Sequence, residues 1–194
     1  MDDQHQEENL IKEYLSGNQE ALAMIFELYK NRILNFCLRI LGNRADAEDV
    51  TADVFLALFS QKYTHNPQAK FSTWLYTVAR NSCISRIRKR KNFVSLWFTS
   101  NEGEVADAWD IPDTNPLSRE ELDQREISSE VRKAISKLPL EQREAIVLRE
   151  YHSLSYEEIA KVLHCSLEKV KILLFRAREQ LRTQLSSFIK EQQK

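Results

Sequence analysis

Residues 154–178 read LSYEEIAKVLHCSLEKVKILLFRAR, and this stretch predicts two short helices joined by a tight turn. Ser155 precedes Glu158 by three residues, so the hydroxyl can accept from one free backbone N–H at a helix start while the carboxylate accepts from another. A helix should therefore begin directly after Ser155. Ser166 is a second good N-cap residue, and the turn before it is short enough to make the two helices neighbours.

The second of these helices separates apolar from polar side chains when it is laid out at about 3.6 residues per turn. Its inner stripe consists of Leu167, Val170, Leu174, Ala177 and Leu181. The opposite face carries Glu168, Lys169, Ile172 and Arg176. Such a face suits a DNA major groove, where Lys and Arg read guanine or phosphate and an apolar group touches a thymine methyl. Helix pairs of this spacing also occur as plain packing units, so geometry alone leaves both roles open.

The composition favours an all-α protein. The chain has 194 residues, of which 42% are hydrophobic and 29% charged, so it can bury a core in one domain or in two small ones. Only three Gly and four Pro are present, which is typical of long helices and few turns. No stretch of alternating apolar and polar residues competes with the helical periodicities.

Charge is strongly segregated behind a net charge of -1. A basic run without an acid contains Arg80, Arg86, Arg88, Lys89, Arg90 and Lys91. Acids gather between Glu102 and Glu126. This asymmetry suits a protein with one polyanionic partner and a separate contact surface, and a merely solvated charge pattern is the alternative.

The cysteines and the first residues bear on the compartment. Cys37, Cys83 and Cys165 form an odd set without a C-x-x-C pair, which fits reduced thiols better than a disulfide framework. The acidic start MDDQHQEE predicts neither a signal peptide nor a membrane span. We therefore expect a cytoplasmic protein with no membrane insertion of its own.

A metal or redox site at His152, His164 and Cys165 is a weak alternative, because two ligand types without a recurring spacing are not typical of metal sites. Cys165 is expected to pack in the turn instead. The sequence contains no catalytic constellation, so we expect no enzyme activity, no cofactor and no metal.

Apolar periodicity predicts two helices in the first part of the chain. A short helix contains residues 10–15 and can end at Gly17 through a left-handed C-cap. A longer helix carries apolar residues at steps of three and four over residues 22–40, and Gly42 can close it.

The third predicted helix, which Asn43 can cap, is acidic near its start. Its acids are Asp46, Glu48, Asp49 and Asp53. Its inner side is expected to consist of Val50, Val54, Phe55 and Leu58. Carboxylates complement the positive end of the helix dipole, but these acids exceed what capping requires. A basic protein partner and a solvated helix start both remain consistent with them.

A fourth helix is predicted after a polar loop, residues 60–70, with Ser72 as its cap. Leu75, Val78 and Ser82 share its expected inner side, and Arg80 points nearly opposite.

Trp74 and Asn81 lie two turns apart on one side of this fourth helix. An aromatic ring beside an amide can stack on an unstacked base and hydrogen-bond it, as single-strand binders do. A core position for Trp74 is the competing interpretation.

Periodicity fails over residues 92–117, where Gly and Pro stand among acids. We therefore predict a flexible acidic linker there, between helical domains of residues 1–91 and 118–194. In the second domain, Pro139 suits the first turn of another helix.

Three segments together resemble those of an extracytoplasmic-function (ECF) sigma factor of bacterial RNA polymerase, of the sigma-70 family. Residues 41–59, LGNRADAEDVTADVFLALF, are similar to the family's polymerase-clamp-binding segment. Residues 71–90, FSTWLYTVARNSCISRIRKR, resemble its promoter-melting helix. Residues 138–182, which include the helix pair, resemble its upstream-element reader. The resemblance covers nearly the whole chain, in the family's order.

The resemblance implies a function. An alternative sigma factor would bind core RNA polymerase, direct it to a specific set of promoters and melt DNA at the downstream element. An anti-sigma factor would control it, and catalysis would belong to the polymerase. The C-terminal domain would contain a helix-turn-helix.

The resemblance also implies site residues. Contacts to core polymerase would come from Asp46, Glu48, Asp49, Asp53 and Phe55. Contacts to the melted single strand of the downstream element would come from Lys70, Phe71, Trp74, Arg80, Asn81, Arg86, Arg88 and Lys89. Contacts to duplex DNA of the upstream element would come from Ser166, Glu168, Lys169, Lys171, Ile172, Phe175, Arg176 and Arg178. The loop before the fourth helix would help Trp74 and Asn81 to trap a flipped base.

The recognition helix departs from the family's pattern. Glu168-Lys169 replaces a common Gly-Thr, and Ile172-Leu173 replaces a common Ser-Arg. One expected basic contact is missing, so the departure predicts altered or weaker upstream readout. Glu168 could accept from a cytosine amine, and Ile172 could touch a thymine methyl.

Two other functions remain open at this point. An autonomous helix-turn-helix regulator would bind DNA without polymerase. A regulator-binding adaptor would have lost promoter recognition, as the apolar Ile172-Leu173 pair suggests, and the same pair could face an anti-sigma factor.

Overall fold

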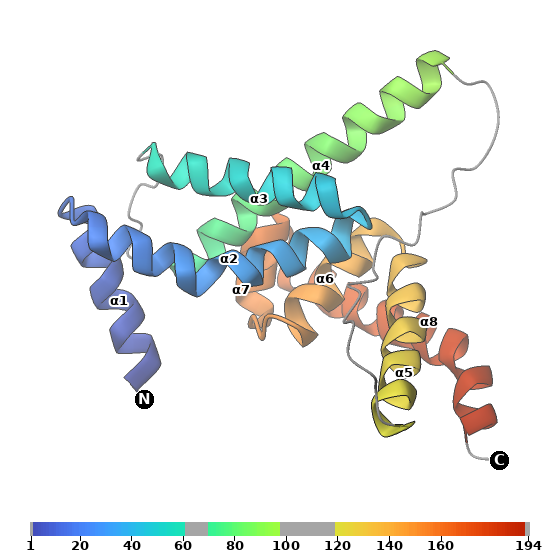
Figure 1. Ribbon diagram of the computed structural model, residues 1–194. Helices are drawn as coiled ribbons and strands as arrows, with labels where there is room; N and C mark the ends of the chain where they lie inside the picture. The colour runs from blue at the N-terminus through green and yellow to red at the C-terminus, as the bar shows by residue number, and fades with distance from the viewer. Residues whose placement is uncertain (1, 61–69, 98–118, 193–194) are drawn as a thin grey trace. The chain divides into compact units, whose positions relative to one another are not determined.

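The computed structural model describes residues 2–60, 70–97 and 119–192, and over these residues every regular element is a helix, as predicted (Figure 1). The chain divides into two compact units, residues 1–104 and 105–194. Each unit is a small helical assembly with its own buried core, so each is described by itself.

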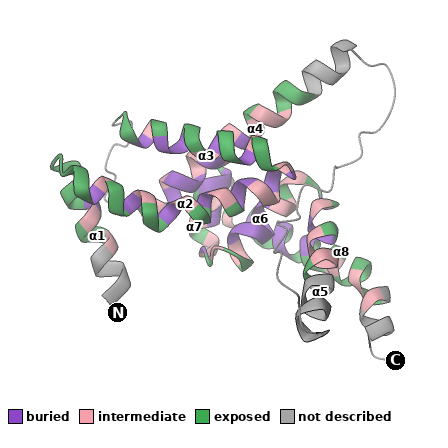
Figure 2. Cartoon of the chain, in the orientation of Figure 1, coloured by how far each residue is buried: buried purple, intermediate pink, exposed green. Residues whose placement is uncertain are grey.

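The first unit is organised around α2 (Gln19–Leu41). Helices α1 (Asp2–Leu15), α3 (Arg44–Phe59) and α4 (Phe71–Trp97) all pack against α2, and α3 also packs against α4. Figure 2 shows the buried positions that recur along α2. They are Ala21, Ile25, Tyr29, Ile33, Phe36, Cys37 and Ile40. The helical period of these apolar residues gives α2 a side on which its neighbours can pack.

The turns that separate the first helices are those predicted from the sequence. Gly17 and Gly42 adopt positive φ angles of 92° and 66°, which glycine reaches without the clash that a Cβ would cause. The Gly42 N–H donates to the Leu38 carbonyl and ends α2. The Asn43 side chain accepts from the Asp46 N–H at 2.9 Å and starts α3. The predicted C-cap of α2 at Gly42 and the predicted N-cap of α3 at Asn43 are both confirmed.

The start of α4 differs from the prediction. The helix begins at Phe71, so Ser72 lies inside the first turn and is not the cap. The Thr73 N–H donates to the Lys70 carbonyl at 3.1 Å. Backbone bonding to Lys70 therefore starts the helix at Phe71, two residues earlier than a side-chain cap at Ser72 would.

The inner side of α4 also differs. Leu75, Ala79 and Cys83 are fully buried, whereas the predicted inner residues Val78 and Ser82 are only half-buried. The apolar side of the helix is thus rotated relative to the prediction. The helix also continues through Trp97, into the stretch for which a linker was predicted. The rest of that predicted linker, residues 98–117, lies outside the described residues.

The second unit places α8 (Leu167–Gln192) against three other helices. These are α5 (Arg119–Ser136), α6 (Leu140–Glu150) and α7 (Tyr156–Leu163). Val170, Leu174 and Ala177 of the predicted inner stripe are buried to within 1% exposure. Leu167 and Leu181, the two ends of that stripe, are half-buried.

The predicted helix-turn-helix is formed by α7 and α8. The Ser155 hydroxyl accepts from the Glu158 N–H at 3.2 Å, and the Glu158 carboxylate accepts from the Ser155 N–H at 2.7 Å. His164 then takes a left-handed conformation at φ 52°, which ends α7. The Ser166 hydroxyl accepts from the Lys169 N–H at 3.2 Å at the start of α8. Both predicted N-caps are confirmed.

The start of α6 corrects a smaller expectation. Pro139 adopts an extended ψ of 143° and stands immediately before the helix, which begins at Leu140. Proline therefore precedes the first turn here instead of forming part of it.

In the part of the chain that the structure describes, no helix combines the length and the apolar character needed to span a bilayer.

Candidate functional site

Arg86 joins the acidic side of α3 to α4. Arg86 of α4 pairs with Asp46 through Nε at 3.2 Å and with Asp49 through a terminal nitrogen at 2.5 Å. The side chains of Arg86 and Asp46 are 34% and 29% exposed, whereas Asp49 is 67% exposed. The predicted polymerase-binding acids and a predicted DNA-binding arginine are therefore in direct contact.

The other predicted acids of α3 have different surroundings. Glu48 pairs with Arg44 one turn earlier at 2.8 Å, and both side chains are exposed. Asp53 is exposed and lies on the side of α3 that faces α4. All four acids therefore remain accessible to some degree, which a protein contact requires.

Phe55 does not belong to this accessible surface. It is only 2% exposed, and its ring meets Phe26 edge-on at a centroid distance of 4.8 Å. It also lies 6.5 Å from the ring of Phe59. The structure therefore assigns Phe55 to the core between α2 and α3, as its apolar period also predicted, and not to a direct contact.

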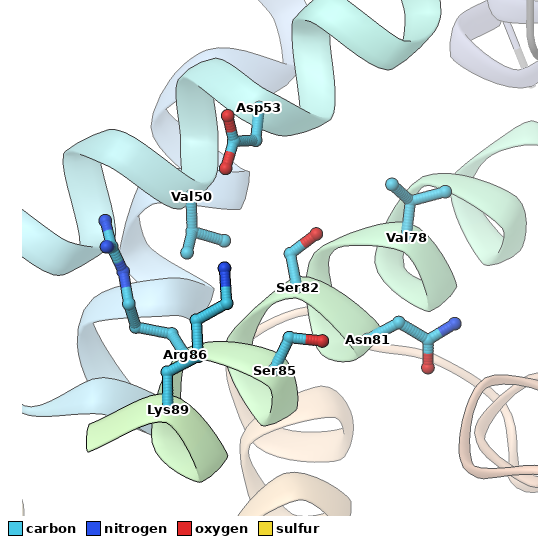
Figure 3. A pocket seen from close by; sticks show the side chains of 8 residues that line it. All are labelled: Val50, Asp53, Val78, Asn81, Ser82, Ser85, Arg86 and Lys89. Carbon is cyan, nitrogen blue, oxygen red and sulfur yellow. The ribbon is translucent and has the colours of Figure 1, made fainter. Parts of the chain in front are cut away.

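A groove of about 330 Å³ runs between α3 and α4 (Figure 3). Its lining side chains are Val50, Asp53, Val78, Asn81, Ser82, Ser85, Arg86 and Lys89. In Figure 3 the Arg86 side chain leaves α4 toward the α3 backbone, whereas Lys89 extends into the middle of the groove. Arg86 and Lys89 lie one turn apart on α4, but Arg86 points to α3 and Lys89 points into the groove.

Phe71 and Trp74, two predicted DNA contacts at the start of α4, differ in how far they are buried. Phe71 is 3% exposed and lies 5.7 Å from the ring of Tyr29, so it is a core residue and offers no surface to DNA. Trp74 is half-buried and lies 6.0 Å from the Phe71 ring. Trp74 therefore packs beside the core and keeps part of its surface accessible.

The polar residues of α4 are unequally accessible. Asn81, Arg88, Lys89 and Arg90 are exposed. Arg80, which was expected to point away from the inner side, is half-buried. Lys70 is exposed just before the helix, and residues 61–69 of the predicted base-trapping loop lie outside the described residues. The accessible basic surface is therefore centred on the later turns of α4.

The outer face of α8 has the side chains that the sequence predicted. Every predicted contact residue from Glu168 to Arg178 is exposed. Two of them are large apolar residues, with Ile172 at 49% and Phe175 at 65% exposure. Leu173 is 7% exposed and packs inward, so it cannot serve an outer contact together with Ile172.

Two basic residues of this face pair with acids of α6. Lys169 meets Glu141 at 2.9 Å, and Arg178 meets Glu150 at 2.9 Å. The hydrogen bond to Glu150 also raises the pKa of the Arg178 guanidinium. Exposed pairs of this kind are weak, so a phosphate can replace the acid at small cost.

Sequence reasoning missed the residues that organise these surfaces. Arg86 was assigned to DNA only, because nothing local to it reveals Asp46 or Asp49. Arg143 was not singled out, yet it donates to the carbonyls of Ser136 and of Leu138, the latter at 3.1 Å, where α5 ends. Burial lowers the pKa of the Arg143 guanidinium.

The structure gives no support to the metal interpretation of His152, His164 and Cys165. Among the described residues, no three His, Cys, Asp or Glu side chains come together as metal ligands. Cys165 is half-buried in the turn between α7 and α8, where it was expected to pack.

Each of the two units contains a segment that matches a known family model. The family model for Sigma-70 region 2 matches residues 25–93, and that for Sigma-70, region 4, matches residues 128–181. The ECF RNA polymerase sigma factor SigW of Bacillus subtilis is 35% identical over 177 residues, which cover 90% of this chain and 94% of SigW. The RNA polymerase sigma-H factor of Pseudomonas aeruginosa is 28% identical over 97% of this chain and 98% of its own.

Solved structures of similar fold include a sigma factor bound to an anti-sigma factor. It is the sigma factor RpoE of Bartonella quintana in complex with the anti-sigma factor NepR. The TM-score is 0.66, with 23% identity over 84% of this chain and 96% of that chain. At this level of identity the likeness concerns the fold.

Proposed function

The chain belongs to the ECF RNA polymerase sigma factors, and we propose that it is an initiation factor that binds core RNA polymerase and directs it to a specific set of promoters. The observation that carries this proposal is the order of the matched regions. Region 2 covers the acidic α3 and the basic α4, and region 4 covers the helix-turn-helix. Both units therefore support the proposal, each through a different matched region.

Contact with core polymerase is assigned to the acidic surface of α3. Asp46, Asp49 and Asp53 are accessible carboxylates on one helix, and Glu48 adds a further one. A surface of this charge favours a basic partner by speeding encounter and fixing register. Phe55 would support this contact indirectly, because it packs α3 on α2.

Melting of the downstream element is assigned to α4. Asn81 and the accessible edge of Trp74 can hold an unstacked base, and Arg88 and Lys89 can hold backbone phosphates. The single strand would be captured as it forms, so the cost of unstacking is offset by stacking and ionic contacts. Phe71 would act only by supporting Trp74.

Recognition of the upstream element is assigned to the outer face of α8. Lys171 and Arg176 are exposed cations beside Ile172 and Glu168. This mixture suits a duplex site with a thymine methyl, an amine-bearing base and nearby phosphates. The departure from a more basic helix predicts sequence preference different from that of relatives with more basic contacts.

Control by an anti-sigma factor is part of the proposal. The similar RpoE structure contains an anti-sigma factor. The exposed Ile172 and Phe175 would give such a partner an apolar contact on α8, in addition to their DNA role. Catalysis would belong to the polymerase, and the protein would act in the cytoplasm, where polymerase and promoter DNA are found.

Binding assays test the proposal and separate it from the two alternatives. Labelled protein is titrated with core polymerase, with a duplex promoter fragment, and with both, at about 0.1 M salt. We expect saturable binding to core, weak binding to free duplex, and promoter binding once core is present. An autonomous regulator would bind duplex tightly without core, and an adaptor would bind core without ever binding a promoter.

A further inference from the structure

Arg86 was expected to hold a DNA phosphate, but its observed contacts point elsewhere. Its guanidinium meets two carboxylates of α3, Asp46 at 3.2 Å and Asp49 at 2.5 Å. These acids stand three positions apart, so they lie on one side of α3, and a planar guanidinium has enough donors to serve both. Arg86 thus joins α4 to the acidic side of α3.

The paired acids keep room for a second partner. A carboxylate offers about four acceptor positions on its two oxygens, so one guanidinium cannot occupy those of both acids. Asp49 remains 67% exposed while it is paired, and Asp46 remains 29% exposed. One cation also leaves a pair of acids with a net negative charge. The cluster can therefore accept a basic side chain from outside without losing Arg86.

The neighbouring basic residues of α4 are more accessible to a phosphate than Arg86 is. Lys89 lies one turn further along α4, is exposed and reaches into the groove (Figure 3). Arg88 and Arg90 are exposed as well. Among the described residues, these three side chains form no ion pair of the kind that Arg86 makes, so they can turn toward a polyanion.

We propose that Arg86 is a positioning residue of the polymerase-binding surface and not a DNA contact. It holds Asp46 and Asp49 in one arrangement, in which their outward oxygens form a two-point acceptor for an arginine or lysine of the basic partner. Holding both side chains in place before binding removes part of the ordering cost of association. This inference rests on the proposed binding to core polymerase.

The experiment measures affinity of the full chain for core polymerase, and affinity of the assembled holoenzyme for single-stranded downstream-element DNA. The variants are Arg86→Gln, Arg86→Lys and Arg90→Gln. Arg90→Gln is the matched control, because it removes the same charge from an exposed position one turn away. Thermal unfolding of each variant reports whether the fold is intact.

The expected result is a split between the two affinities. Arg86→Gln should weaken core binding about threefold to tenfold and leave DNA binding by holoenzyme unchanged. Arg86→Lys should restore core binding only in part, since an ammonium lacks the planar fork that meets both acids. Arg90→Gln should bind core like the natural protein.

A double-mutant cycle keeps the test decisive if Arg86→Gln is less stable. In an Asp46→Asn/Asp49→Asn background, adding Arg86→Gln should weaken core binding no further, because the arginine acts through those acids. A full further loss would overturn the proposal.

Other outcomes would overturn it as well. If Arg86→Gln lost DNA binding but kept its affinity for core polymerase, Arg86 would be a phosphate contact. If Arg86→Gln bound core polymerase more tightly, Arg86 would compete with the polymerase for the two acids. Failure of the natural protein itself to bind core would instead refute the proposed function.

Discussion

Single residues decide what the acidic surface of α3 can bind. Asp46 and Asp49 are accessible carboxylates of one helix side, and their common partner Arg86 neutralises only part of their charge. The charge of these two side chains should therefore matter more to a basic partner than that of acids elsewhere on the unit.

The first prediction concerns that charge. Asp46→Asn/Asp49→Asn should weaken binding to core polymerase by about tenfold at low salt, and less at high salt, because screening already reduces the attraction. Titrations with labelled protein at several salt concentrations measure this. Glu27→Gln is a suitable control, since Glu27 is an exposed, paired acid on α2. Equal affinity of the double variant and the natural protein would remove the acidic surface from the interface.

Two buried tyrosines predict an alkaline limit of stability. Burial raises the pKa of Tyr29 and of Tyr76 above the ordinary value of 10.0, and the 2.5 Å hydrogen bond from Tyr29 to Glu7 raises that of Tyr29 further. Above this ordinary value the unfolded chain loses these protons while the folded chain keeps them. The stabilisation is therefore complete below about pH 10 and declines above it, by about 1.4 kcal/mol per pH unit for each tyrosine.

Urea unfolding between about pH 8 and pH 12 measures this decline. Tyr29→Phe/Tyr76→Phe should be less stable at neutral pH but should lose less stability per pH unit above about pH 10. An unchanged slope in that variant would mean that other groups cause the alkaline loss.

The outer residues of α8 make a prediction about promoter choice. Glu168 is exposed, and Ile172 is 49% exposed on the same face. Ile172→Ala and Glu168→Gln should each change the preferred base at one upstream position, by about 1–3 kcal/mol of discrimination. Sequencing of transcripts from a randomised upstream element measures this. Unchanged preferences in both variants would assign these side chains to a protein partner.

At the scale of helices, the sequence predicted correctly the helix starts that depend on a side-chain N-cap. Asn43 and Ser155 cap α3 and α7 as predicted, because an N-cap acts only on residues next to it. The start of α4 and the rotation of its inner side were missed. They depend on packing against α2 and α3, which leaves no local mark in the sequence.

For the candidate site too, features local to one helix were predictable from the sequence, and contacts between helices were not. The acids of α3 and the outer face of α8 follow from helical period alone. Burial of Phe55 and Phe71 depends on Phe26 and Tyr29, far away in the chain. The pairing of Arg86 with α3 depends in the same way on how two helices meet.

The capping box of α7 gives a prediction at this scale. Ser155→Ala should destabilise the second unit by about 1 kcal/mol, because it leaves the Glu158 N–H without its side-chain partner. Hydrogen exchange of the α7 amides in the full chain measures the change. Ser186→Ala, near the exposed end of α8, is the control. If α7 were equally protected in both variants, the box would not limit opening of this helix.

At the scale of the whole molecule, the chain has two units with separate cores, and the proposed contacts divide between them. Region 2 holds the proposed polymerase and downstream-element surfaces, and region 4 holds the proposed upstream-element surface. A covalent connection makes the second contact intramolecular once the first has formed.

This division predicts the behaviour of separated parts. A fragment of residues 1–97 should bind core polymerase nearly as well as the full chain, whereas a mixture with residues 119–194 should bind promoters roughly 100-fold more weakly or worse. Promoter-complex titrations measure both. Full recovery of promoter binding by the mixture would show that the connection contributes nothing.

The most direct measurement is run-off transcription by core polymerase on a genomic promoter library, with and without the protein, read out by sequencing. The proposed function predicts new transcripts with discrete start sites that share one downstream and one upstream element. An absence of added transcripts, although the protein binds core polymerase, would contradict the claim that it directs initiation.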